Sequence, residues 1–189
     1  MRCSSAFIAD TLFGKGPVTV VDSVDTEKYL GHWFQMYGSN SIYLTFERNA
    51  YCVTADYSLA NDGSGRIAVL NSETLGSGNG TKKVIHGYAT PSSTPGKLTV
   101  DLEGVLFSAP YWVTKLGPAN CGPDNLYQYA VVTDNLRATL FVLARDVQVF
   151  RQTYEEEVLQ YLKQNGFTTV VNRPVKTYHE QDCQYNTHA

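Results

Sequence analysis

Eight short runs of β-branched and aromatic residues, each followed by a turn-forming stretch, constrain the fold of this chain most strongly. The runs cover residues 29–37, 51–59, 66–71, 83–89, 97–103, 110–116, 127–133 and 139–145. In the run 97–103, Leu98, Val100 and Leu102 alternate with polar residues, as in a strand with one buried face. Eight strands at this spacing predict an all-β, up-and-down antiparallel barrel, which leaves room inside for one small ligand.

One amphipathic helix is predicted after the last strand, over residues 153–166. Thr153 and Glu156 have the spacing of a capping box, and Gly166 gives a C-terminal stop. The apolar stripe consists of Val158, Leu159, Tyr161 and Leu162. Because a single helix of this length is not stable alone, we expect it to pack against the outside of the barrel.

The whole chain, residues 1–189, is predicted to form a single domain. Within it we expect an irregular arm over 1–24, the barrel over 25–150, and an extended C-terminal strap over 167–189. The composition suits a β-protein, with 13 Tyr, 15 Gly and only 17% charged residues. The net charge of −3 gives no reason to expect nucleic acid as a partner.

The first strand contains a Gly-x-Trp sequence, Gly31-His32-Trp33, which is expected to form the floor of the barrel. Gly31 lets the backbone pass close to a neighbour, and Trp33 has enough apolar area to plug one end of a core. Arg145, at the end of the last strand, could lie across the Trp33 ring. These three residues are predicted to be structural rather than chemical.

Four widely spaced cysteines, Cys3, Cys52, Cys121 and Cys183, form no Cys-x-x-Cys pair, so a zinc site is not expected. Their even number suits two disulfides in an oxidising compartment, and four reduced thiols in a cytosolic protein is the alternative. We therefore expect a secreted, extracellular protein. No apolar signal region follows Met1, so the signal peptide is expected to have been removed.

Five segments together carry a resemblance to the lipocalin family, within its apolipoprotein D and bilin-binding branch. They are Tyr-Leu-Gly-His-Trp at 29–33, Ala-Asp-Tyr-Ser-Leu at 55–59, Ile-Ala-Val-Leu-Asn at 67–71, Ser-Ala-Pro-Tyr-Trp at 108–112 and Leu-Ala-Arg at 143–145. The resemblance extends from Tyr29 to about Cys183. It departs from the branch at 118–124, where a longer loop stands in place of a short turn.

The resemblance implies a disulfide between Cys52 and Cys183. In the branch, a second bridge joins the N-terminal arm to the seventh strand, whereas Cys121 lies before that strand. The Cys121 loop should sit at the closed end of the barrel, where the arm also passes, so a Cys3–Cys121 bridge is expected there.

The resemblance and the strand alternation together predict a binding pocket lined by inward-facing residues. These are Tyr37, Tyr57, Val69, Asn71, Tyr111 and Phe141, with Tyr37 on the same face as Trp33. Such a cup is mostly apolar, with the Asn71 amide and Tyr hydroxyls as its polar groups. The ligand should enter at the end that carries the 38–50 loop.

The leading hypothesis is a secreted carrier of one small hydrophobic molecule: a bilin, retinoid, carotenoid, sterol or fatty acid. No cofactor is required, although biliverdin would be a non-covalent chromophore. An enzyme on the same scaffold is one alternative, but no catalytic or metal-binding constellation is apparent and Cys52, the one candidate nucleophile, is expected to be oxidised. The other is an interaction or defence module, whose apolar 38–50 loop binds a lipid surface or a second copy of the chain.

Overall fold

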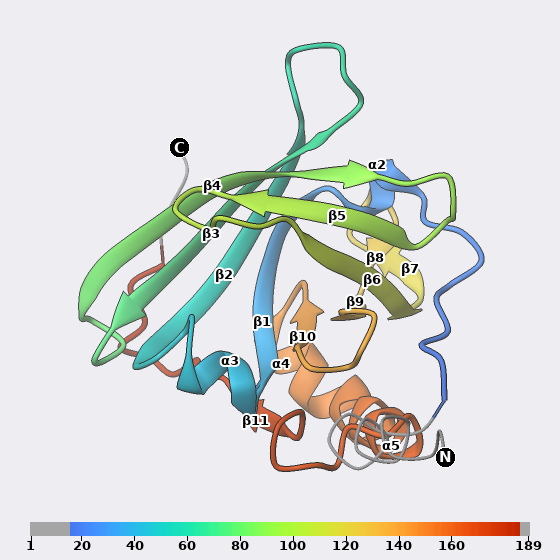
Figure 1. Ribbon diagram of the computed structural model, residues 1–189. Helices are drawn as coiled ribbons and strands as arrows, with labels where there is room; N and C mark the ends of the chain where they lie inside the picture. Colours follow the sequence, from blue (N-terminus) through green and yellow to red (C-terminus); the bar gives the residue numbers. More distant parts are fainter. Residues whose placement is uncertain (1–15, 186–189) are drawn as a thin grey trace, which may run out of the picture.

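The computed structural model describes residues 16–185 and shows a closed antiparallel barrel (Figure 1). Each strand of the barrel pairs with the next along the chain, and the last pairs with the first. The eight strands are β1 (Gly31–Ser39), β2 (Ala50–Leu59), β3 (Ile67–Leu75), β4 (Thr81–Pro91), β5 (Lys97–Leu102), β6 (Ala109–Leu116), β9 (Tyr129–Thr133) and β10 (Leu140–Ala144). The predicted eight-stranded up-and-down barrel is therefore confirmed.

Three short strands lie outside this cycle. The stretch 117–125, expected to be a plain loop, contains β7 (Ala119–Cys121), which forms a small hairpin with β8 (Leu126–Tyr127). In the C-terminal strap, β11 (Pro174–Lys176) pairs with the end of β1. Two short helices flank β1: α2 (Thr26–Tyr29) precedes it and α3 (Asn40–Leu44) follows it.

The C-terminal helical region begins earlier than the capping box predicts. It consists of α4 (Val147–Val149), a π-helical turn over Phe150–Tyr154, and α5 (Glu155–Gln164). The side chain of Asp146 accepts hydrogen bonds from the backbone N–H groups of Gln148 and Val149, so Asp146 is the N-cap and the predicted start at Thr153 is wrong. Gly166, with φ of 85°, follows the end of the helix as predicted.

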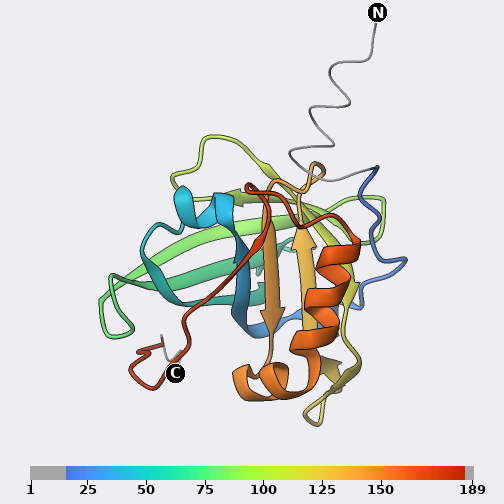
Figure 2. The ribbon, with the colours of Figure 1, turned by 90° about the horizontal axis from the view of Figure 1, so that it is seen from below.

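The barrel wall separates two apolar cores. The inner core contains Trp33, Tyr57, Val69, Val132 and Leu143, among others. The outer core joins the barrel to the helix and includes Met36, Val142, Phe150, Val158 and Leu162. Figure 2 shows the helix lying along β9 and β10 on the outside of the barrel, as expected. None of the helices within 16–185 is long and apolar enough to span a membrane.

A bulge in β1 moves Tyr37 to the opposite face from the one predicted. Gln35 pairs with Leu143 of β10, but Tyr37 pairs with Val142, so Met36 is an extra residue in β1. Tyr37 therefore belongs to the outer core, where its hydroxyl donates to Glu155 of α5 at 2.7 Å. It does not line the barrel interior, because one extra residue reverses the inward and outward alternation beyond it.

The disulfide between Cys52 and Cys183 is confirmed, with 5.6 Å between the two Cα atoms. It ties β2 to the C-terminal strap across 131 residues of chain. In the chain-entropy model, closing a loop of this length stabilises a fold by about 4 to 5 kcal/mol. Cys3 lies outside the described residues, and Cys121 forms no disulfide within them. The Cys3–Cys121 pairing therefore remains a prediction.

Candidate functional site

Arg145 closes one end of the barrel by stacking on Trp33, as predicted. Its guanidinium carbon lies 3.6 Å from the centroid of the indole, which is fully buried. The guanidinium also donates to five backbone carbonyls at 2.7–3.3 Å, those of Lys28, Tyr29, Leu30, His32 and Tyr127. Burial lowers the pKa of Arg145 to about 10, so the group keeps its charge at neutral pH.

Gly31 is required by this arrangement for two reasons. Its φ of 97° lies in the region that favours glycine. A Cβ atom at this position would also lie 3.3 Å from Nη1 of Arg145, a close contact with the group that closes the barrel. Gly31, Trp33 and Arg145 thus act together as the structural floor.

Three tyrosines form a hydrogen-bonded layer next to the floor. The Tyr111 hydroxyl lies 2.7 Å from that of Tyr29 and 3.1 Å from that of Tyr57. Burial raises the pKa of Tyr57 to about 12, and also raises the pKa values of Tyr29 and Tyr111. Tyr57 and Tyr111 face inward as predicted, but their hydroxyls already have each other as partners. Tyr29, which was not among the predicted pocket residues, completes the layer.

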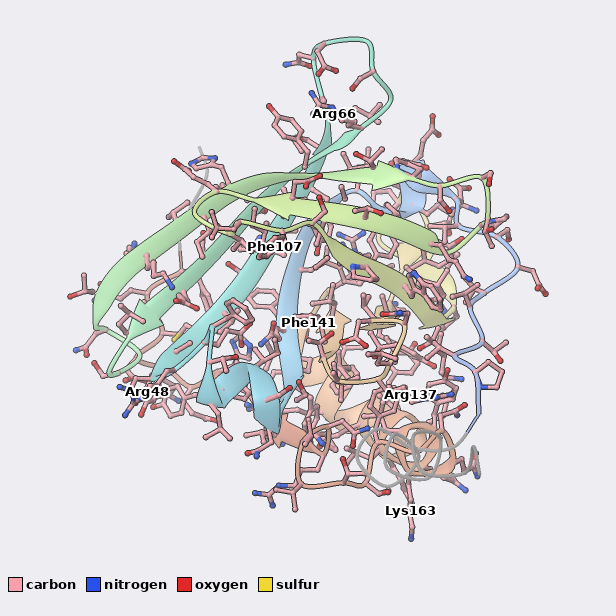
Figure 3. All side chains as sticks on the ribbon, viewed as in Figure 1. Arg48, Arg66, Phe107, Arg137, Phe141 and Lys163 are labelled. Carbon is pink, nitrogen blue, oxygen red and sulfur yellow. A yellow bond between two sulfur atoms is a disulfide. The ribbon has the colours of Figure 1, made fainter. Side chains whose placement is uncertain are left out.

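Towards the open end, several inward-facing side chains keep accessible surface. Val69 is buried in the inner core. Phe141 packs against this core and is only half-buried. Asn71 pairs with Ala55 of β2 and Ile85 of β4, which places its side chain on the inner face. Phe141 lies in the middle of the barrel in Figure 3. The barrel interior is therefore filled at the floor, whereas Asn71 and Phe141 keep part of their surface accessible.

The mouth of the barrel is the end opposite the floor, where the 38–50 loop lies. A network of polar side chains surrounds it. Gln35, inward on β1, donates from Nε2 to the Glu47 carboxylate at 2.5 Å and to the Tyr43 hydroxyl at 3.4 Å. On the inner face of β3 and β4, Lys83 forms a 2.7 Å ion pair with Glu73, directly across the two strands. Among the described residues, no lysine, arginine or histidine forms an ion pair with Glu47.

The surrounding protein raises the pKa of the Glu47 carboxyl strongly. Burial is the largest cause, and the negative charge of Glu73 adds to it, so the pKa of Glu47 rises from near 4.5 to about 8. The hydrogen bond from Gln35, which is second in size to burial, and the smaller effect of the Lys83 charge act in the opposite direction. The carboxyl is surrounded by protein, whereas the Glu47 residue as a whole keeps some accessible surface.

The sequence contained a signal for part of this network. Glu73 lies two residues beyond Asn71 and Lys83 two residues before Ile85, so strand alternation places both on the inner face. The third predicted strand ended at Asn71, so Glu73 was not among the residues predicted to face inward. Glu47 lies in an irregular segment between α3 and β2, where no periodicity indicates its direction.

Exposed apolar side chains lie around the mouth of the barrel. In an up-and-down barrel, alternate connections share one end, here those after β1, β3, β5 and β9. Three of these connections carry large apolar residues that are more than half exposed: Leu44, Phe46, Leu106, Phe107 and Leu136. Figure 3 shows Phe107 on the connection between β5 and β6. The mouth therefore combines a polar inner network with an apolar rim.

A separate cavity of about 280 Å³ lies near the closed end. It is bounded by the segment 23–26, the connection between β4 and β5 at 92–96, and inner-core residues that include Tyr29, Ile67 and Val113. The segment before α2 is fixed here by hydrogen bonds, such as that from Val21 N–H to the Val113 carbonyl. This cavity is distinct from the mouth and contains none of the six residues predicted to bind ligand.

The floor predicts a clear contrast between the two tryptophans. Trp33→Ala should lower the free energy of unfolding by about 3 to 5 kcal/mol, because it leaves a buried void and removes the partner of Arg145. Trp112→Ala is the matched control, since Trp112 is half-buried with Lys97 Nζ 3.8 Å from its ring centroid. Urea unfolding should show a much smaller loss for Trp112→Ala. Equal losses would contradict this account of the floor.

The raised pKa of Glu47 predicts that the stability difference between Glu47→Gln and the native protein changes with pH. Because the pKa of Glu47 is raised in the folded state, its carboxyl favours folding below pH 4.5 and lowers stability as pH rises towards 8. Glu47→Gln should therefore gain stability relative to the native protein between pH 5 and pH 8, by about 2 kcal/mol.

Urea unfolding at several pH values would measure this difference. Glu103→Gln is the control, because Glu103 is exposed at the end of β5 and should show no such trend. A difference between Glu47→Gln and the native protein that stays constant with pH would mean that the carboxyl is not perturbed.

Comparison with known proteins agrees with the fold. Residues 24–175 match the family model described as a lipocalin-like domain. Apolipoprotein D of Cavia porcellus is 40% identical over 104 residues, which cover 53% of this chain and 51% of that protein, so the chain spans about half the length of this relative. Temperature-induced lipocalin-1 of Arabidopsis thaliana is 30% identical over 153 residues, covering 76% of this chain and 75% of the relative.

Among solved structures, insecticyanin from the tobacco hornworm Manduca sexta superposes with a TM-score of 0.61. The match covers 89% of this chain and 88% of insecticyanin at 18% sequence identity, which indicates a shared fold. With the family model covering most of the barrel and a relative matched over three quarters of its length, the family is established. The chain belongs to the lipocalin family.

Proposed function

We propose that this protein binds a small hydrophobic molecule inside its barrel and takes it up through the open end. The observation that carries this proposal is the contrast along the barrel axis. Trp33, Arg145 and the tyrosine layer fill one end, whereas inward-facing Asn71 and Phe141 keep accessible surface towards the other. This contrast favours the mouth as the route by which a ligand reaches the interior.

The residues proposed to contact the ligand are those on the inner face above the tyrosine layer. Phe141 offers an aromatic face and Asn71 an amide, while Val69 and the rings of Tyr57 and Tyr111 form the apolar base. This is the usual composition of a small-molecule site, an apolar surface with a few polar groups that orient the ligand. A bilin, retinoid, carotenoid, sterol or fatty acid fits this description, and biliverdin would be a bound chromophore.

The Cys52–Cys183 disulfide supports the proposal that the protein is secreted, because such bonds persist in oxidising compartments. The same bond bears on the enzyme alternative. The thiolate is the nucleophilic form of cysteine, and the sulfur of Cys52 is held in the disulfide. A carrier role therefore has more support than catalysis through Cys52.

A second role is favoured by the apolar rim. Leu106 is 90% exposed and Phe107 is 81% exposed, on the same side of the barrel as Leu44 and Phe46 of the 38–50 loop. Apolar side chains gathered in this way mark surfaces that contact lipids or other proteins. We propose that the rim lets the mouth approach a lipid surface, from which a hydrophobic ligand would be taken. Association of two copies through the rim is the alternative.

The binding proposal predicts the effect of Phe141→Ala on affinity. The ligand is first extracted from protein purified from its natural source and identified by mass spectrometry and visible absorption. Phe141→Ala should weaken its binding by about 1 to 3 kcal/mol, which is roughly 5- to 150-fold in Kd, because an aromatic contact is lost. Quenching of tryptophan fluorescence would measure the affinity.

Phe34→Ala is the matched control for this measurement. Phe34 lies on the outer face of β1, where its ring contacts those of His179 and Tyr185. Its loss should lower stability without changing Kd. Unchanged affinity in a folded Phe141→Ala protein would place the ligand outside the barrel and favour the surface role.

A further inference from the structure

We propose that the ligand carries a basic amine, and that its ammonium group forms an ion pair with Glu47 at the mouth of the barrel. This inference rests on the proposed function, since it assigns the polar end of the molecule bound in the interior. Glu47 lies between the inner face of β1, where Gln35 contacts it, and the inner face of β3 and β4, whose Glu73 and Lys83 act on its charge. Glu47 is therefore placed at the end of the barrel through which the ligand is proposed to enter.

The charges around the mouth favour a cation over an anion. Lys83 is already paired with Glu73 at 2.7 Å, so these two charges largely cancel. When Glu47 is ionised, the group of three therefore carries one net negative charge. A fatty-acid carboxylate would meet repulsion here, whereas an ammonium would supply the cation that Glu47 lacks among the described residues.

Three other cations near this end are engaged elsewhere, and two, Arg48 and Arg173, are exposed. Lys82, on the outer face of β4, donates to the Tyr185 carbonyl, and Arg137 donates to the carbonyls of Gly16 and Pro17. Lys176 pairs with Glu155 on the outside of the barrel. Arg48, although next to Glu47 in sequence, is exposed and lies at the edge of the molecule in Figure 3.

The depth of the site sets the orientation of the ligand. Glu47, Gln35 and Tyr43 are near the mouth, and Val69 and the tyrosine layer lie further in. Phe141 pairs with Gly38 and Gln35 with Leu143, so Phe141 lies further from the floor than Gln35. An amphiphile with an amine at one end and an apolar body would place the body against Val69 and the tyrosine layer, with Phe141 beside it, and the ammonium beside Glu47. Its charge would remain close to solvent, which limits the cost of desolvation.

Binding of a cation should be linked to proton release. Near pH 7 a carboxyl with a pKa of about 8 is mostly protonated, and an ammonium beside it lowers that pKa. The other charged or titratable groups around it are Tyr43, Glu73 and Lys83, and burial raises the pKa of Tyr43 so that it stays neutral in this range. Amine affinity should therefore increase from pH 6 to pH 9.

Dodecylamine, dodecanol and laurate test the inference, because each has twelve carbons in an unbranched chain and they differ in the head group. At pH 8 and below their aggregation concentrations, the purified full chain should bind dodecylamine at least about tenfold more tightly than the other two. Glu47→Gln should weaken dodecylamine binding about tenfold and leave dodecanol unchanged. Glu103→Gln, an exposed carboxyl at the same end of the barrel, should change neither.

Calorimetry of the native protein gives a second readout that needs no variant. Dodecylamine binding at pH 7, compared in buffers of different ionisation enthalpy, should release roughly one proton. No preference for the amine, no release of a proton, or an equal loss of affinity in Glu47→Gln and Glu103→Gln would overturn the inference. If dodecanol and laurate still bind in a Phe141-dependent way, the proposed function survives. If none of the three ligands depends on Phe141, the proposed function itself fails.

Discussion

The fold depends on the contact between Arg145 and Trp33. The last barrel strand ends where the first begins. The guanidinium joins them by covering the indole and by donating to the carbonyls of residues 28, 29, 30 and 32. Five carbonyl acceptors and one aromatic face satisfy a charge that would otherwise be costly to bury. Packing and hydrogen bonds together close this end around Trp33, and the inward-facing side chains that keep accessible surface, Asn71 and Phe141, lie towards the other end.

The second constraint is the bulge in β1 at Met36. It turns Gln35 into the barrel and Tyr37 out of it, so one short segment serves both cores. The outward Tyr37 bonds to Glu155 of the helix, while the inward Gln35 holds Glu47 at the mouth. The Gln35 and Met36 carbonyls at the bulge accept hydrogen bonds from His179 and from the Thr177 N–H of the C-terminal strap. The bulge thus connects the attachment of the helix to the polarity of the mouth.

Strand alternation and the family motifs predicted much of this structure. The barrel and the outer helix follow from local patterns that tertiary packing does not reverse. The Cys52–Cys183 bond was implied by the family resemblance, and the Arg145–Trp33 contact by the order of the strands. Tyr37 was misplaced because a bulge leaves no mark in a run of apolar residues. The helix start was wrong because Asp146 and Thr153 are both acceptable caps, and packing of Phe150 in the outer core accompanies the earlier start. Glu47 was missed because irregular segments have no period to follow.

The most direct test of the central claim is a crystal structure of the protein with its extracted native ligand. The account predicts ligand density on the inner face of the barrel, against Phe141 and Asn71, with its polar end beside Glu47. Density in the cavity of about 280 Å³ near the closed end, or on the apolar rim with the interior filled by side chains, would contradict it.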